Sequence, residues 1–187
     1  MAAPDCLYFT DDEEACRLLA ADPFALLVGV ALDQQVTVQQ AFAGPLRLKQ
    51  RLGTLDPKAI AAIDPAAVEA AFKEKPAIHR FPGSMASRVQ DIARLVTDEY
   101  GGHAERLWME AADADDLKRR VGALPGFGDM SVRTLGVILE KRFDVPAAQG
   151  IAPDHMTLGD VDSHESLAEY QAAKRAHKAA MRAAKAS

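Results

Sequence analysis

The chain has 187 residues, of which 49% are hydrophobic, 26% charged and 6% aromatic, and its formal net charge is −5. This balance excludes a disordered chain and suits one domain or two closely packed lobes, and the longest apolar stretch, residues 24–32, is too short to cross a bilayer. The negative charge argues mildly against a nucleic-acid partner, yet residues 171–187 carry five basic side chains and no acid, so the charge leaves that partner open.

Helix signals follow one another along the chain. Capping residues, Asp-Pro starts and glycine stops predict helices near residues 10–20, 24–42, 44–53, 64–72, 84–100, 113–121, 129–143 and 163–184, with a short one starting at 56. Residues 144–162 are predicted to form a loop rich in Pro and Gly, and no stretch shows the alternation of a strand. The predicted fold class is therefore all-α. The helix over residues 24–42 is apolar nearly all round at its start, so we expect it at the centre.

The strongest signal is a tight turn between two predicted helices, Leu124-Pro125-Gly126-Phe127-Gly128. Glycine adopts a positive φ without a clash, and its missing side chain lets a phosphate touch the backbone. The next helix begins at Asp129, so its unpaired N–H groups face the same place. The pattern predicts a turn that holds the phosphates of a duplex without reading its sequence. The alternative is a plain corner whose glycines only cap helices, and the charge of Asp129 opposes a phosphate unless that residue caps its own helix.

Four segments, taken in order, resemble the helix-hairpin-helix (HhH-GPD) superfamily of base-excision DNA glycosylases. Residues 124–128 resemble the family's hairpin, residues 32–38 (LDQQVTV) its glutamine-bearing helix end, and residues 153–155 (PDH) the loop that presents an aspartate. Residues 84–92 are similar to the helix entry of the branch that removes alkylated bases, the 3-methyladenine DNA glycosylase II branch. The resemblance implies two helical lobes around a cleft. It also implies a single unit over residues 1–187, with a core at about 22–160, the helix-hairpin-helix at about 112–143 and a basic C-terminal helix at 163–187.

The resemblance also implies site residues. The family's catalytic aspartate falls on Asp154, where a carboxylate would stabilise the positive charge that develops on the sugar and orient the attacking water. A simple turn cap at Asp154 is the alternative, and Asp160 and Asp162 are the other candidate carboxylates. Gln35 falls where family members fill the gap left by an extruded base, although two glutamines exposed at a helix end would look the same. The residues expected to contact DNA are Gln34, Gln35, Leu124, Pro125, Gly126, Phe127, Gly128, Met130 and Ser131.

Met130 stands where bifunctional members of the family carry a lysine, so the resemblance implies hydrolysis without a Schiff-base lyase step. Cys6 and Cys16 cannot build a four-cysteine iron–sulfur cluster and no Cys/His set has zinc spacing, so we expect no cofactor or metal beyond a monovalent cation on the hairpin carbonyls. We expect a monomeric, cytoplasmic DNA N-glycosylase, nucleoid-associated if bacterial, that removes an alkylated or deaminated base from double-stranded DNA without a membrane partner. The alternatives are a DNA-binding module of this fold without chemistry and a helical interaction protein with no nucleic-acid role.

Overall fold

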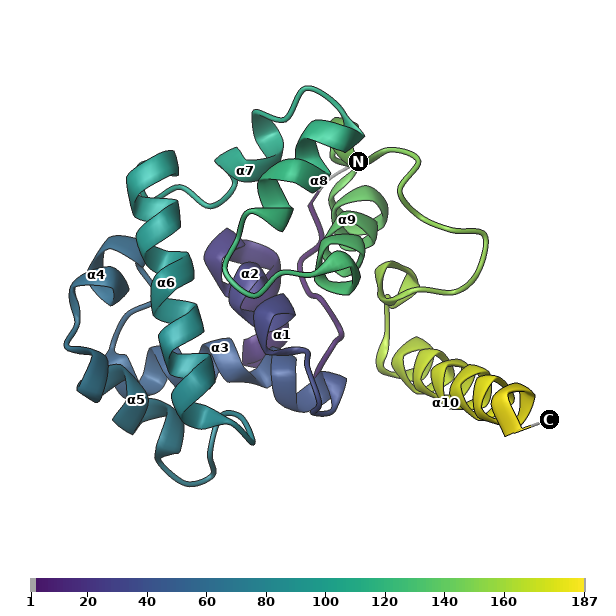
Figure 1. Ribbon diagram of the computed structural model, residues 1–187, viewed down its shortest axis with the longest axis horizontal. Helices are drawn as coiled ribbons and strands as arrows, with labels where there is room; N and C mark the ends of the chain where they lie inside the picture. The colour runs from purple at the N-terminus through teal and green to yellow at the C-terminus, as the bar shows by residue number, and fades with distance from the viewer. Residues whose placement is uncertain (1–2, 187) are drawn as a thin grey trace.

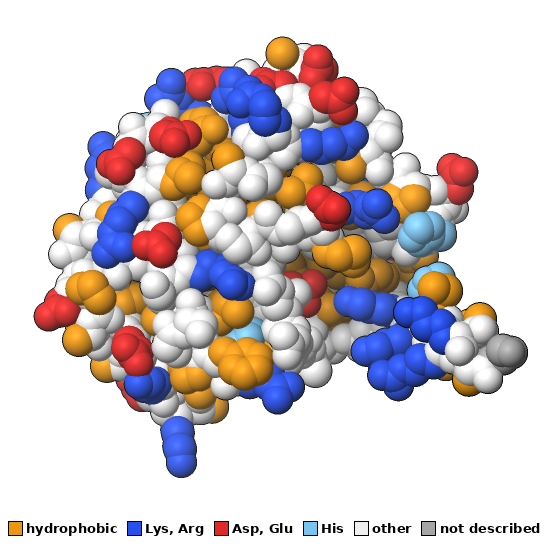
Figure 2. Space-filling view, in the orientation of Figure 1, with side chains coloured by type: hydrophobic (Ala, Val, Ile, Leu, Met, Phe, Trp, Pro, Cys, Tyr) orange, Lys and Arg blue, Asp and Glu red, His pale blue; other side chains and the backbone are white. Residues whose placement is uncertain are grey.

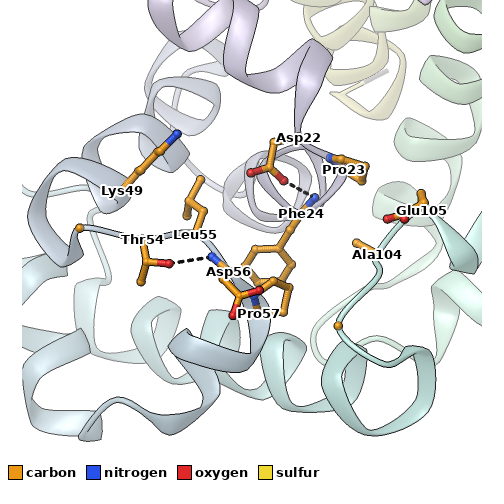
Figure 3. A pocket seen from close by; sticks show the side chains of 12 residues that line it. Asp22, Pro23, Phe24, Lys49, Thr54, Leu55, Asp56, Pro57, Ala104 and Glu105 are labelled. Atoms are coloured by element: carbon orange, nitrogen blue, oxygen red, sulfur yellow. Dashed lines mark hydrogen bonds between the residues drawn. The ribbon is translucent and has the colours of Figure 1, made fainter.

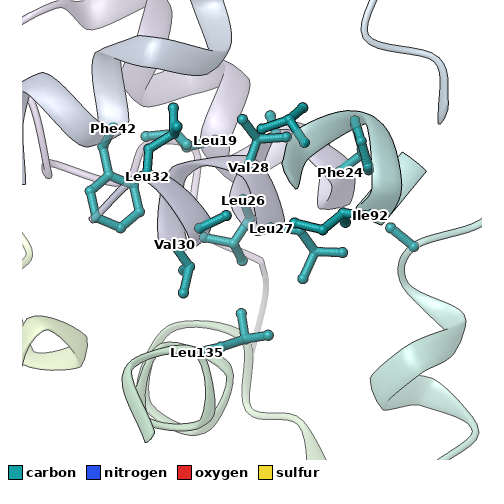
Figure 4. Packing of buried hydrophobic residues seen from close by; sticks show 14 of the residues in the cluster. Leu19, Phe24, Leu26, Leu27, Val28, Val30, Leu32, Phe42, Ile92 and Leu135 are labelled. Atoms are coloured by element: carbon teal, nitrogen blue, oxygen red, sulfur yellow. The ribbon is translucent and has the colours of Figure 1, made fainter. Parts of the chain in front are cut away.

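Helix α2 (Pro23–Leu32) runs through the middle of the molecule and is its most apolar element. It begins where the Asp22 carboxylate accepts hydrogen bonds from the N–H groups of Phe24 (2.9 Å) and Ala25 (3.2 Å), with Pro23 in the first helical position. Every residue after Pro23 is buried. Side chains from other helices, such as Phe42, Ile92 and Leu135, surround it (Figure 4). The core is therefore built around one helix.

The computed structural model describes residues 3–186, and in that range the chain forms helices and no strand. The prediction of an all-α fold is confirmed. The α-helices are α1 (Glu13–Ala21), α2 (Pro23–Leu32), α3 (Val38–Leu52), α4 (Pro57–Ala62), α5 (Pro65–Lys73), α6 (Pro82–Tyr100), α7 (Arg106–Met109), α8 (Ala114–Gly122), α9 (Asp129–Phe143) and α10 (His164–Ala186), and the short 3₁₀ turns are η1 (Pro146–Ala148) and η2 (Leu158–Asp160).

The helices form two groups on either side of α2 (Figure 1). In one group α4 and α5 pack against α6, and α5 also contacts α3. In the other group α8 packs against α9, and η1 and η2 cover α9. Helix α2 contacts α3 and α6 from the first group and α9 from the second. The two-lobed arrangement expected from the sequence is present, with α10 extending away from the body (Figure 1).

The prediction of one helix over residues 24–42 is wrong. The chain leaves the helix at Asp33 and starts α3 only after Thr37, whose hydroxyl accepts a hydrogen bond from the N–H of Gln40 at 3.2 Å. Between the two helices Gln35 adopts a φ of +58°, a left-handed conformation that a continuing helix does not allow. The apolar pattern continues across this break, which is why it concealed the turn.

The prediction that Gly44-Pro45 opens a helix is also wrong, because both residues lie inside α3. A proline within a helix loses one backbone hydrogen bond, and here tertiary packing compensates. Both residues are buried, and a Cβ on Gly44 would come within 2.5 Å of Leu32 Cδ1 and 3.2 Å of Ile78 Cγ2. Close packing of α3 on α2 thus stabilises a helix that continues past Pro45.

Other predicted boundaries are close to the observed ones. Helix α9 spans residues 129–143 as predicted, and Asp113 caps α8. Helix α1 is capped by Asp12 instead of Thr10, since the Asp12 carboxylate accepts from the N–H of Ala15 at 3.0 Å. Among residues 3–186 no single helix is long and apolar enough to span a bilayer, although α1 and α2 taken together pass that test with a 116° bend between them.

Candidate nucleic-acid interface

The hairpin between α8 and α9 hides its apolar side chains and exposes its glycines. Leu124 and Phe127 are buried, and the N–H of Phe127 donates to the Leu124 carbonyl at 3.1 Å to close the turn. Gly126 and Gly128 are exposed, and Gly126 has a φ of +76°. No side chain caps the start of α9, where Asp129 is exposed and Gly128 is the cap residue. No side chain therefore occupies the backbone N–H groups at this helix start, which leaves them available to a phosphate.

Three side chains tie the hairpin to the rest of the molecule. Gln34 Nε2 donates to the Gly126 carbonyl at 3.3 Å, and Arg88 Nη1 of α6 donates to Gln34 Oε1 at 3.0 Å. The buried His79 accepts from the N–H of Phe81 through Nδ1 at 3.1 Å, so its Nε2 donates to the Gln34 carbonyl at 2.9 Å. Burial lowers the pKa of His79, which suits this neutral imidazole. The hairpin and the α2–α3 turn thus form one connected unit.

The two glutamines in the α2–α3 turn lie differently. The Gln34 amide is engaged with Arg88 and Gly126. Gln35 is exposed, and its backbone has a positive φ of +58°. A residue other than glycine in this conformation is uncommon and costs about 1–3 kcal/mol, a cost that recurs at functional sites. Of the two side chains, Gln35 is therefore the more accessible one.

A large cavity of about 1190 Å³ opens beside the hairpin. Its walls are the end of α2, the first turns of α9, the loop around residues 153–158 and one face of α10. Figure 2 shows the hollow beside α10, with hydrophobic side chains inside it and Lys and Arg side chains along α10. Gly126, Gly128, Met130 and Ser131 all line this cavity. The structure therefore joins the hairpin and a pocket in a single surface.

The charged and titratable groups of the cavity come from every wall. They are Asp33 directly after α2, Asp129 and Arg133 from α9, His155 from the loop, and Tyr170, Lys174, His177 and Lys178 from α10. Burial raises the pKa of Asp33 above its usual value, and the nearby Lys174 ammonium reverses part of that shift. The sequence reading missed Asp33, Arg133 and Lys174. A carboxylate directly after a very apolar helix was the one available signal for Asp33.

Asp154 lies at the edge of the cavity. Glu140 of α9 accepts hydrogen bonds from the N–H groups of Gly150 (2.9 Å) and Ala152 (2.6 Å), which fixes the loop before it. Pro153 and His155 line the cavity, whereas Asp154 is exposed and is not among the lining residues. In this conformation the Asp154 carboxylate is not part of the cavity wall, although both of its neighbours in the chain are.

Asp160 and Asp162 serve the local fold. Asp160 binds Lys141 Nζ at 2.6 and 2.8 Å and accepts from the N–H and hydroxyl of Thr157. Burial alone would raise the pKa of Asp160, but the hydrogen bonds from Lys141 and Thr157 outweigh it and hold the pKa below its usual value. Asp162 accepts from the Ser166 hydroxyl at 3.0 Å at the start of α10. Neither residue lines the cavity.

A second, smaller cavity of about 410 Å³ lies at the other end of α2 (Figure 3). Two of its three carboxylates cap helices: Asp22 caps α2, and Asp56 Oδ2 accepts from the N–H of Ala59 at 2.9 Å to cap α4, while the third, Glu105, lies 3.4 Å from His103 Nδ1. Thr54 accepts from the N–H of Asp56 at 3.0 Å. Asp22, Asp56 and Thr54 stabilise helix starts, so the chemistry of the molecule is expected at the hairpin cavity. Among residues 3–186 no three His, Cys, Asp or Glu side chains gather as a metal site would need.

Comparison with known proteins gives one match. The family model for the HhH-GPD superfamily base excision DNA repair protein matches residues 28–187. No curated protein and no solved structure matched the chain. The family match covers the α2–α3 turn, the hairpin, the loop around Asp154 and α10, the same elements that the structure gathers at the cavity. The chain belongs to the HhH-GPD superfamily of base excision DNA repair proteins.

Proposed function

We propose that this protein is a monofunctional DNA N-glycosylase, which hydrolyses the bond between a damaged base and its sugar in duplex DNA. The observation that carries the proposal is the hairpin itself, whose exposed glycines and uncapped helix start border a cavity of about 1190 Å³. The hairpin would hold the phosphate backbone, and a base turned out of the stack would enter the cavity. Family membership supports the same repair role.

The DNA-contacting surface has three parts in this proposal. The hairpin residues Leu124–Gly128, together with Met130 and Ser131, bind the phosphate backbone of the DNA. Gln34 holds the hairpin in place. Gln35 enters the duplex at the position that the extruded base leaves empty. Helix α10 adds positive charge, because its exposed side chains from residue 174 onward include five Lys or Arg and no acid. Neutralising phosphates with such side chains gives salt-dependent affinity. We expect the protein to act as a monomer in the cytoplasm.

Chemistry at the sugar is assigned to Asp154, which would assist the attacking water from the rim of the cavity. Met130, which is 71% exposed, stands where a Schiff-base lysine would be needed, so the abasic product would be released without strand cleavage. We expect an alkylated or deaminated base as the substrate. We expect no iron–sulfur cluster, and the hairpin carbonyls offer ligands to a monovalent cation.

The test is base release from duplex oligonucleotides that each carry one lesion, measured as abasic sites cleaved by alkali. The wild-type protein should release at least one damaged base. Asp154→Asn should lose most of that activity, typically 100-fold or more for a group that assists water, on the order of the effect of a general base. Glu165→Gln, an exposed acid on α10, is the matched control. Equal rates for wild type and Asp154→Asn would remove Asp154 from the mechanism.

A second candidate is a DNA-binding module of this fold without chemistry, favoured by the exposed position of Asp154 outside the cavity lining. It predicts duplex binding that weakens with salt and no release of any base. Base release by the wild type that is abolished by heat denaturation and lost in Asp154→Asn would dismiss it.

A further inference from the structure

Asp33 occupies an unfavourable place for a charged carboxylate. It caps the C-terminus of α2, where unpaired carbonyl groups and the negative end of the helix dipole lie. Its side chain is half-buried and lines the cavity. No donor within residues 3–186 hydrogen-bonds its oxygens. Little in the α2 turn therefore supports the ionised form, and the carboxyl is open to a ligand in the cavity.

One cation acts on this carboxyl. Lys174 lies on the face of α10 that lines the same cavity, with its Nζ 5.7 Å from the centre of the Tyr170 ring. Burial raises the pKa of Asp33 and Lys174 partly lowers it. Burial therefore favours the protonated carboxyl, and the Lys174 ammonium favours the carboxylate that forms when the proton leaves. The other titratable or charged groups that face the cavity are Asp129, Arg133, His155, Tyr170, His177 and Lys178.

We propose that Asp33 is the acid of this cavity: its carboxyl donates a proton to the departing base, and Lys174 stabilises the carboxylate that remains. This inference rests on the proposed glycosylase function and deepens it. A base leaves more readily when it departs as a neutral molecule than as an anion, and proton donation by a positioned side chain contributes about 10²–10⁴-fold in rate. Asp154 at the rim keeps its separate role toward water.

The step balances without any further reactant. The bond between the sugar C1′ and the base nitrogen breaks, and its electron pair stays on the base, which takes the proton from Asp33. Water then forms the new bond to C1′ and gives up a proton, which restores the Asp33 carboxyl. The net change consumes one water and yields an abasic sugar and a free base.

The same groups indicate the class of base. Three cations, Arg133, Lys174 and Lys178, line the cavity against the two carboxyls of Asp33 and Asp129. When Asp33 holds its proton, the cavity carries more positive than negative charge, which disfavours a cationic base. A base that is already cationic also needs no proton to leave. We therefore assign the site to neutral, deaminated bases in preference to cationic alkylated ones.

The test compares two lesions under single-turnover conditions with saturating protein. Asp33→Asn should lose about 100-fold or more in the rate of release of the neutral base hypoxanthine. Its rate on a duplex carrying the cationic base 7-methylguanine should change little, because that leaving group needs no proton. Asp98→Asn, an exposed acid on α6, is the matched control, and circular dichroism checks that each variant is folded.

A second variant tests the proton directly. The rate on hypoxanthine should fall as pH rises through the pKa of Asp33, since only the protonated carboxyl donates. Lys174→Met removes the cation that favours the carboxylate, so the falling limb of the pH profile should move to higher pH. Lys178 lines the same cavity. Lys178→Met should therefore weaken DNA binding without moving the falling limb of the pH profile. The pH profile of Lys174→Met tests the role of Asp33 even if Asp33→Asn fails to fold.

The outcomes separate the two proposals. No base release by the wild type from any lesion would overturn the glycosylase function and this inference with it. Release by the wild type, with Asp33→Asn equally fast on hypoxanthine and at every pH, would overturn the role of Asp33 alone. An equal loss on hypoxanthine and 7-methylguanine, or a pH limb unmoved in Lys174→Met, would also overturn proton donation by Asp33.

Discussion

The Arg88 side chain occupies the space in which a side chain on Gly126 would lie. A Cβ placed on Gly126 would overlap Nε, Cδ and Cζ of Arg88. The same guanidinium donates to Gln34 Oε1 at 3.0 Å, and Gln34 in turn holds the Gly126 carbonyl. One residue of α6 therefore determines how the hairpin from one lobe meets the α2–α3 turn, and the glycine is required by a neighbour as well as by its own φ of +76°.

Two alanine substitutions in the hairpin should separate packing from DNA contact. Gly126→Ala should destabilise the protein by about 1–3 kcal/mol, because its φ is positive and Arg88 must move. Gly128→Ala has open space and a φ of −94°, so its stability should stay within about 0.5 kcal/mol of the wild type. Both should weaken duplex binding. Urea unfolding and DNA titration measure the two effects, and a well-folded Gly126→Ala with full affinity would contradict this account.

Arg88 should matter more than another arginine on the same helix. Arg88→Ala leaves the Gln34 amide without its donor and should cost about 1–3 kcal/mol of stability as well as DNA affinity. Arg94→Ala removes only an exposed pair with Asp91 at 2.7 Å and should cost less than about 1 kcal/mol. Chemical denaturation of both variants gives the comparison. Similar losses in the two would mean that the contact between α6 and the hairpin is weaker than its geometry suggests.

Met130 offers a gain-of-function test of the hydrolytic mechanism. The wild type should give no covalent complex with lesion-bearing DNA in the presence of borohydride, because no amine is present at this position. Met130→Lys places an amine on an exposed residue that lines the cavity, and it should yield a trapped complex visible on a denaturing gel. Met181→Lys, on the far wall of the cavity, is the control for a lysine added elsewhere. Trapping by the wild type would show that another amine acts.

Asp33→Asn should stabilise the protein in a pH-dependent way. The unfolded chain loses the Asp33 proton near the usual value of 3.8, and the folded protein loses it at higher pH. Between those values the folded state binds more protons, so the free energy of unfolding contributed by Asp33 falls as pH rises. Asparagine does not ionise. The variant should therefore melt close to the wild type at pH 3.5, on the order of the unshifted Asp pKa, and above it at neutral pH.

The control for that comparison is Asp98→Asn, whose exposed side chain should leave the melting temperature nearly unchanged at both pH values. A wild type that melts above Asp33→Asn at neutral pH would mean that the carboxylate is stabilised in the fold. Natural sites often keep such a destabilising group because activity requires it.

Local signals predicted the elements that local chemistry controls. Helix α9 begins after the glycine turn and ends at Phe143, as predicted. Asp22, Asp56 and Asp64 cap helices as expected. The break after Leu32 escaped prediction because the apolar pattern continues across it. What ends the helix there is a set of long-range contacts, such as the bond from His79 to the Gln34 carbonyl, which no short window contains.

The site was predictable to the same extent. The hairpin is a contiguous motif, so a glycine turn between two helices was predictable from local sequence, whereas the burial of the Leu124 and Phe127 side chains was not predicted. The carboxyl in the cavity was not predictable, because Asp33 and Lys174 are 141 positions apart in the sequence and meet only in the folded chain. DNA contact by the hairpin and catalysis by Asp154 remain predictions.

The walls of the cavity differ in how they are held. The α2 and α9 walls belong to the core, whereas α10 is attached near its start by the buried Leu167 and by Gln171, which donates to Gln39 at 2.6 Å, and its residues beyond 171 are exposed. Displacing the outer turns of α10 would break few of the contacts that hold the protein folded. A duplex could thus be admitted at small energetic cost, while the surface that orients it stays rigid.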